Sequence, residues 1–252
     1  NDKKEKKKLC EIYKESADNG DDEAMKNYGQ MLYVGDQVKQ NKKEAIRYIK
    51  MAIEKGNVKA MCNYAVILRK GDDENPANKE EALKLYKKAA DLDNSTAMFN
   101  YAMMMYKGEG TNVNKEEALK YFKKASDKGK PMAMIKLAIM LKEGDGIEEN
   151  KEEAANLFKL AADNGSADGM FNYAQMKEIG DGVEIDKKEA AKYYKLMADK
   201  GEYDGMFHYG RMLENGEGFE SCNIKKALEY YKMASKRYPK AAEAYKRLTE
   251  KK

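Results

Sequence analysis

The sequence of 252 residues contains 48 Lys and Arg and 44 Asp and Glu, which gives a net charge of +4. Basic and acidic residues are thus nearly balanced, which argues against a surface dedicated to binding nucleic acid. The sequence contains no run of about 18 apolar residues, so we expect no membrane-spanning helix and no membrane partner. Three cysteines, Cys10, Cys62 and Cys222, fall at unrelated positions, and this odd, sparse set indicates a reducing compartment, for which we expect the cytoplasm. The chain does not begin with Met and is treated as a fragment, which we expect to be monomeric.

The first predicted element is an amphipathic helix over residues 1–20, whose Ile12, Tyr13 and Ala17 match only the second half of the units that follow. Each following unit pairs two amphipathic helices across a glycine turn, because glycine adopts left-handed backbone angles without strain. The predicted units cover residues 22–56, 58–93, 95–129, 131–165, 167–201 and 203–237. A last capping helix is predicted over residues 239–252. One pair cannot bury its own apolar face, so we expect residues 1–252 to stack as a single array.

Equivalent positions of the units, here called columns, keep their register along the whole chain. The small residue of the first helix recurs at intervals of 36 or 37 residues, as Ala24, Ala60, Ala97, Ala133, Gly169, Gly205 and Ala241. The turn glycine recurs as Gly35, Gly71, Gly108, Gly144, Gly180 and Gly216. The second helix is marked by Ala45, Ala82, Ala118, Ala154, Ala190 and Ala227. These registers predict an all-α solenoid of about six full repeats with a half repeat at each end.

The second helices also carry a signal for where they begin. Asn41 with Glu44, and Asn114 with Glu117, have the spacing of a capping box, which satisfies amide donors at a helix start. Two closing positions depart from the pattern, since Asp93 in one unit and Arg237-Tyr238-Pro239 in the last replace the glycine that ends the other units.

The repeated pattern resembles a known family. A-x-x-x-Y-A-x-x-x-x-x-G-x-G-V, then a polar stretch and K-x-A-x-x-Y-Y-x-x-A-A-D-x-G, is similar to the Sel1-like repeat, a longer-period relative of the tetratricopeptide repeat. Residues 180–183 (GDGV) and 190–201 (AAKYYKLMADKG) match it best, and the resemblance extends from about Leu9 to Leu248. It implies a right-handed superhelix of helix pairs that serves as a binding scaffold and not as an enzyme.

Two columns invite a metal interpretation. Methionine fills one column (Met25, Met61, Met98, Met134, Met170 and Met206) and most of another (Met31, Met104, Met140, Met176 and Met212). A thioether site for a soft metal is one interpretation, but spacing tied to the repeat favours a core of flexible apolar side chains. The acidic turns at 108–110, 144–146, 180–182 and 216–218 supply one carboxylate each, too few for calcium, and favour helix termination.

The sequence offers little material for catalysis. His208 is the only histidine, and it occupies a column that elsewhere holds Asn or Lys. No nucleophile beside a base and no metal-ligand cluster is present, so we expect no enzyme activity, no cofactor and no metal.

In tetratricopeptide relatives the first helix of each pair lines a concave groove, and the resemblance identifies that face here. One variable column reads Lys26, Cys62, Phe99, Ile135, Phe171, Phe207 and Glu243. Four residues further along each helix, on the same face, stand Gln30, Val66, Met103, Ile139, Gln175 and Arg211. An apolar centre with aromatic anchors suits a protein-binding hot spot. The alternative is that these side chains pack between neighbouring first helices.

A column of asparagines adds a second element, because Asn is a poor helix former in mid-helix. Its amide donates and accepts hydrogen bonds, so Asn63, Asn100 and Asn172 could bind the backbone of an extended peptide. Simple descent from a duplicated unit is the alternative.

We therefore predict a non-enzymatic scaffold that binds a protein or peptide in the groove. The candidate contact residues are Phe99, Phe171, Phe207, Ile135, Met103, Ile139, Asn63, Asn100, Asn172, His208 and Arg211. A helical-repeat RNA-binding protein, and a structural or self-associating spacer module, remain the alternatives.

Overall fold

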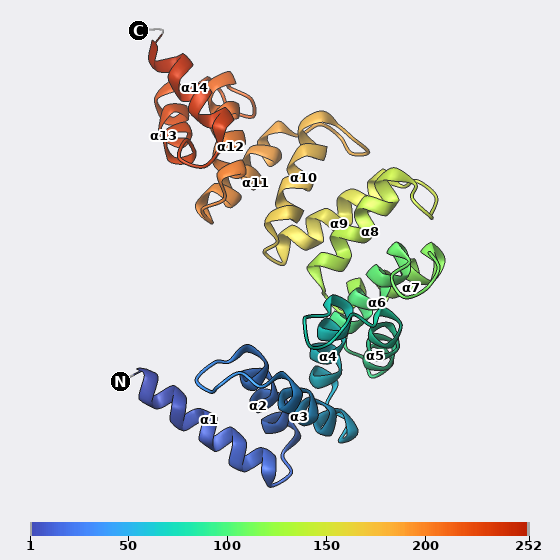
Figure 1. Cartoon of the computed structure of the whole chain (residues 1–252). Coiled ribbons are helices and arrows are strands. Elements are labelled where there is room, and N and C mark those ends of the chain that lie inside the picture. Colours follow the sequence, from blue (N-terminus) through green and yellow to red (C-terminus); the bar gives the residue numbers. More distant parts are fainter. Residues whose placement is uncertain (1, 251–252) are drawn as a thin grey trace. The chain divides into compact units, whose positions relative to one another are not determined.

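The computed structural model describes residues 2–250, and over this range the chain folds into fourteen helices joined by short turns (Figure 1). Residues 1, 251 and 252, at the ends of the two predicted capping helices, lie outside the described residues. The helices are α1 (Asp2–Asp18), α2 (Asp22–Val34), α3 (Lys42–Glu54), α4 (Val58–Lys70), α5 (Lys79–Asp91), α6 (Ser95–Lys107), α7 (Lys115–Asp127), α8 (Pro131–Glu143), α9 (Lys151–Asp163), α10 (Ala167–Ile179), α11 (Lys187–Asp199), α12 (Tyr203–Asn215), α13 (Ile224–Ala234) and α14 (Pro239–Glu250).

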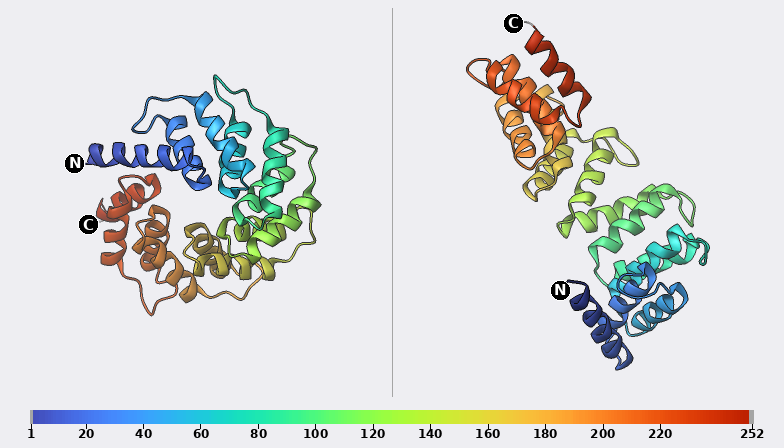
Figure 2. Two further views of the ribbon diagram at one scale, coloured as in Figure 1. Left: turned by 90° about the horizontal axis from the view of Figure 1, so that it is seen from below. Right: turned by 60° about the vertical axis from the view of Figure 1, so that its left-hand side comes forward.

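The chain divides into two compact units, residues 1–125 and 126–252, and the division falls within α7. In each unit a helix packs mainly on its neighbours in sequence, as α2 does on α1 and α3, and α12 on α11 and α13. Figure 2 shows the same pairing of consecutive helices from two further sides. The predicted all-α solenoid of helix pairs, with a single helix before the first pair and another after the last, is confirmed. The extension of one array over the whole chain stays a prediction.

Most helices begin at a side-chain cap close in sequence, and most first helices end at a turn glycine. The Asn41 Oδ1 accepts the amide of Glu44 at 3.0 Å, and the Asn114 Oδ1 accepts the amide of Glu117 at 2.9 Å, so both predicted caps are in place. The turn glycines end most first helices in the left-handed conformation. Asp93 adopts the same conformation, with φ of 69°, at the position where other units have glycine.

Methionine supplies much of the core, as the spacing predicted. Every member of the first methionine column is at most 7% exposed, and four members of the second are fully buried. Met31 differs, because it is only half-buried next to the first helix pair. Unbranched thioether side chains adapt to the irregular space between stacked helices, which explains their use in every repeat.

The acidic turns end helices, as predicted, and also join neighbouring repeats. Glu109 pairs with Arg69 of the preceding repeat at 2.7 Å. Asp181 lies 3.0 Å from Lys142 and 2.9 Å from Lys151, again in the preceding repeat. These pairs are partly buried, so they link adjacent turns more firmly than fully exposed charges would. Between residues 2 and 250, no helix has both the length and the apolar character that crossing a membrane requires.

Candidate binding surfaces on the first helices

The second unit brings three of the candidate residues into one aromatic cluster. Phe171 on α10 and His208 on α12 meet edge to face, with ring centroids 5.4 Å apart. Phe207 meets the same imidazole at 5.2 Å. Tyr194 on α11 stacks on His208, with centroids 4.9 Å apart and an interplanar angle of 18°. Phe171, Phe207 and His208 are each half-buried, so the rings pack on one another while keeping part of their surface in solvent.

His208 has an unusual environment for a polar side chain. Its Nδ1 is buried and has no hydrogen-bond partner among the described residues. Burial lowers the pKa of His208, and the positive charge of Arg211 lowers it further. The imidazole is therefore favoured in its neutral form, which suits a ring that packs between aromatic neighbours.

Arg211 lies one helical turn beyond Phe207 and is held in an ion-pair network. Its Nη2 lies 2.5 Å from a carboxylate oxygen of Glu178, and its Nη1 lies 3.1 Å from Glu217. The second oxygen of Glu178 accepts the Tyr194 hydroxyl at 3.1 Å. Burial, together with the nearby Glu178 carboxylate, raises the pKa of Tyr194. The network fixes the guanidinium beside the aromatic cluster.

A cavity of about 790 Å³ opens next to this cluster. Phe207 and Arg211 form part of its wall from α12, Tyr231 contributes from α13, and Lys240 and Arg247 contribute from α14. Arg247 is paired with Glu214 at 2.8 Å, whereas Lys240 has no ion-pair partner among residues 2–250. The cavity thus has an aromatic wall and a charged rim.

In the first unit, two members of one variable column meet the asparagine column. Gln30, Asn63 and Val66 line a cavity of about 400 Å³ together with Tyr33 and Lys70.

The remaining candidates in the first unit lie on α6. The Phe99 ring lies 5.8 Å from that of Phe122, which is fully buried on the second helix of the same pair, so Phe99 packs partly toward the core. It is only half-buried, as are Asn100 and Met103 on the same helix.

Not every candidate shares one surface. Phe99 belongs to the first unit, and Phe171 and Phe207 belong to the second, so the members of the aromatic column are divided between the two units. Ile135 and Ile139 are half-buried on α8, in the second unit. Asn172 donates a hydrogen bond from its Nδ2 to the carbonyl of Asp168 at 2.8 Å, so one of its two N–H groups is already used within α10.

Sequence reasoning missed the tyrosines of the second helices. Tyr194 and Tyr231 are almost completely buried, yet their hydroxyls reach Glu178 and Glu214 on the paired first helices at 3.1 and 2.8 Å. A signal existed: where the two preceding repeats carry Phe122 and Phe158, these repeats carry Tyr and have Glu 16 or 17 residues before it. A buried hydroxyl needs a partner, so the two changes belong together.

Paired helices repeated at 36 or 37 residues, closed by turn glycines and filled with columns of small residues and Met, define a helical-repeat protein. The chain belongs to the Sel1 repeat family, whose model matches residues 22–57, 58–94, 95–130, 131–166, 167–202 and 204–238. The resemblance seen in the sequence is confirmed. Proteins of this family generally act as protein-interaction scaffolds, and the family is typically non-catalytic.

Solved structures of similar proteins share the fold. A protective antigen of uropathogenic Escherichia coli with an SLR fold is 24% identical, with a TM-score of 0.84 over 90% of this chain and 48% of that protein. A Sel1 repeat protein from Oxalobacter formigenes is 23% identical, with a TM-score of 0.85 over 94% and 68%. An immunity protein from Pseudomonas aeruginosa is 21% identical, with a TM-score of 0.52 over 85% and 80%. The chain thus spans about half the length of the first of these proteins. No curated protein matches the sequence.

Proposed function

We propose that this chain is a non-enzymatic scaffold that holds a peptide or protein segment against its first helices. Phe99, Phe171 and Phe207 are the apolar anchors of the proposal, and Asn63, Asn100 and Asn172 contact the backbone of the bound segment. Arg211, His208 and the half-buried Ile135, Ile139 and Met103 complete the surface. The proposal includes the organisation of residues 1–252 as one array.

The observation that carries the proposal is the cavity beside Phe207 and Arg211. Variable residues that only packed helices together would leave no such space open to a partner. Here an aromatic wall stands next to charged groups, and a half-exposed Phe has surface left to bury against a ligand. Arg211 is already oriented by Glu178 and Glu217, so a partner would not have to order that side chain on binding.

The candidate asparagines of the two units differ in how much hydrogen-bonding capacity they leave for a partner. Asn172 retains one N–H and its Oδ1 for a partner, since its other N–H is bonded to Asp168. Asn63 lines a cavity, where an extended backbone could reach its amide.

The test is capture of partners from a lysate of the source cells on the immobilised chain, followed by quantitative mass spectrometry. The Phe171→Ala/Phe207→Ala variant is compared with the wild type and with Phe219→Ala, a matched change at a half-buried ring that packs on Tyr209 in a turn. We expect proteins that the wild type and Phe219→Ala retain and the double variant loses. Equal capture by all three chains would move the site away from the first helices.

A further inference from the structure

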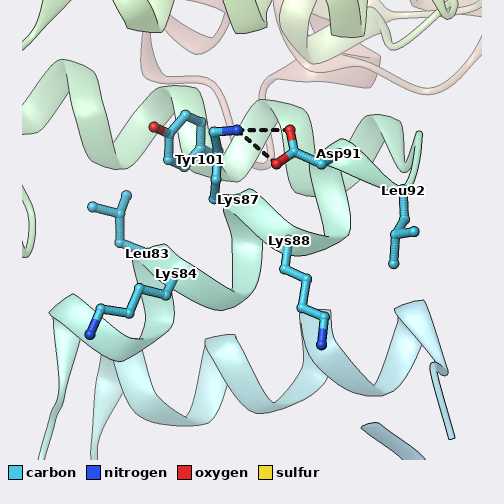
Figure 3. A pocket seen from close by; sticks show the side chains of 7 residues that line it. All are labelled: Leu83, Lys84, Lys87, Lys88, Asp91, Leu92 and Tyr101. Atoms are coloured by element: carbon cyan, nitrogen blue, oxygen red, sulfur yellow. Dashed lines mark hydrogen bonds and ion pairs between the residues drawn. The ribbon is translucent and has the colours of Figure 1, made fainter. Parts of the chain in front are cut away.

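A second groove lies on α5, away from the variable columns of the first helices (Figure 3). It is a cavity of about 500 Å³, lined by a single side of α5, by Leu92 directly after that helix and by one residue of α6. We call it the α5 groove and define it by Leu83, Lys84, Lys87, Lys88, Asp91, Leu92 and Tyr101.

The leucines of the α5 groove are not core residues. Leu92, which directly follows α5, is 53% exposed, whereas Leu85 within α5 is 9% exposed and packs inward. Leu83 is half-buried. Residues four apart lie on one side of a helix, so Leu83 shares its side with Lys87, and Lys84 shares its side with Lys88. The groove therefore has aliphatic surface with ammonium groups beside it.

Only one of the three lysines is neutralised. Lys87 lies 2.8 and 2.7 Å from the two carboxylate oxygens of Asp91. Lys88 makes no ion pair with any residue between 2 and 250, and Lys84 has only a 3.9 Å contact with half-buried Glu81. Figure 3 shows the ammonium groups of Lys84 and Lys88 reaching away from Tyr101, while Lys87 turns toward Asp91. Two cations are thus available to a ligand.

The groove arises where this repeat departs from its own pattern. In the Lys88 column the other repeats carry Met51, Lys124, Leu160, Leu196 and Met233, so Lys stands where four of six repeats have an apolar residue. In the Leu92 column they carry Lys55, Lys128, Asn164, Lys200 and Arg237, so Leu stands where all others are polar. The two exchanges lie four residues apart and create an exposed leucine next to an unpaired lysine. Repeat packing does not require either change, because the other repeats stack without them.

We propose that the α5 groove binds an acidic peptide segment that carries an aliphatic anchor residue. The anchor lies against Leu83 and Leu92, and acidic side chains next to it pair with Lys84 and Lys88. Charge complementarity selects an acidic ligand, and the leucine surface selects an aliphatic side chain. A nucleic acid would need aromatic faces for its bases, and the one aromatic ring of the groove, Tyr101, is only 8% exposed. This surface is distinct from the first-helix surfaces of the proposed function and does not depend on them.

The test selects short random peptides, displayed on phage, against three immobilised chains: the wild type, Lys88→Glu/Leu92→Ser, and the matched variant Lys236→Glu/Met233→Ser. The matched variant makes the same kinds of change at exposed positions near the end of α13. Circular dichroism confirms that each chain is folded. We expect peptides with acidic residues beside Leu, Ile or Met to be enriched on the wild type and the matched variant. The same peptides, made synthetically and measured by fluorescence anisotropy, should bind Lys88→Glu/Leu92→Ser about tenfold more weakly.

Three outcomes would overturn the proposal. The first is that no acidic and aliphatic peptides are enriched. The second is that the enriched peptides bind Lys88→Glu/Leu92→Ser as tightly as the wild type. The third is that single-stranded RNA, and not peptide, binds the wild type and is lost by that variant. A Phe171→Ala/Phe207→Ala chain should keep these peptides, so failure of this proposal is separable from failure of the first-helix site.

Discussion

Replacing Gly182 by Ala tests how closely neighbouring repeats approach each other. Gly182 follows Asp181 in a turn and has φ of 78°, and a Cβ added there would lie 2.2 Å from the Cβ of Lys151 and 2.8 Å from its carbonyl carbon. Carbon atoms in contact stand about 3.5–4.0 Å apart, so the turn would have to move by more than about 1 Å. A left-handed backbone costs a non-glycine residue about 1–2 kcal/mol, and overpacking costs about 1–3 kcal/mol. We expect Gly182→Ala to lower the free energy of unfolding by about 2–5 kcal/mol.

Gly201→Ala is the matched control. Gly201 has φ of 89°, but a Cβ there would meet no atom within 4 Å, so only the backbone cost of about 1–2 kcal/mol applies. Urea unfolding followed by circular dichroism gives both free energies by linear extrapolation. Hydrogen exchange should place the loss for Gly182→Ala in the amides of α9 and α10. If the two variants are equally destabilised, the close approach of Gly182 to Lys151 does not contribute to repeat stacking, and the reasoning fails.

Three further predictions concern single side chains. Burial lowers the pKa of His208 below its ordinary value of about 6.5, so its neutral form stabilises the folded chain above that pH, and this contribution is lost as the pH falls through the folded pKa. Because His208 is the only histidine, its ring protons can be followed alone by NMR, and a midpoint at or above the ordinary value would contradict the packing described. Tyr193→Phe removes a hydrogen bond of 3.1 Å to Asp163 on the preceding second helix, and should lower the free energy of unfolding in urea by about 0.5–1.5 kcal/mol. An unchanged free energy would mean that water replaces this hydrogen bond equally well. Thiol labelling of the native chain should modify exposed Cys222 first and buried Cys10 last, because burial shields the Cys10 thiol and also raises its pKa. If peptide mapping finds the reverse order, the placement of α1 is wrong.

The fold could be predicted from the sequence because its causes are local and repeated six times. The spacing of Asn41 and Asn114 to a following Glu indicates where helices begin, and the turn glycines indicate where helices end. The role of Asp181 could be predicted only in part. Its flanking glycines indicate a helix end, but its pairing with Lys142 and Lys151 depends on how one repeat meets the next.

The candidate surfaces were harder to predict, because columns specify which helix face a residue occupies but not what lies opposite. The columns assigned Phe171 and Phe207 to first helices, and in the structure both rings meet that of His208. They could not reveal that Tyr194 stacks on His208, since the tyrosine comes from a second helix and from another column. Nor could they show that the Asn172 side chain donates to the carbonyl of Asp168 in its own helix, because in the folded chain water and that carbonyl compete for the same N–H group.

Residues that leave their column are where binding functions should be sought in this chain. A position that keeps one residue type through the repeats answers a need common to all of them, such as the buried methionines. His208 and Lys88 do not, since His208 stands in a column of mostly Asn, and exposed Lys88 stands in a column where four of six repeats have an apolar residue. His208 gains an aromatic stack on Tyr194, and Lys88 gains no described ion pair. Lys88 therefore makes no ion pair that would stabilise the described part of the folded chain. A ligand that supplies a carboxylate is the simplest physical reason for a lysine at this position.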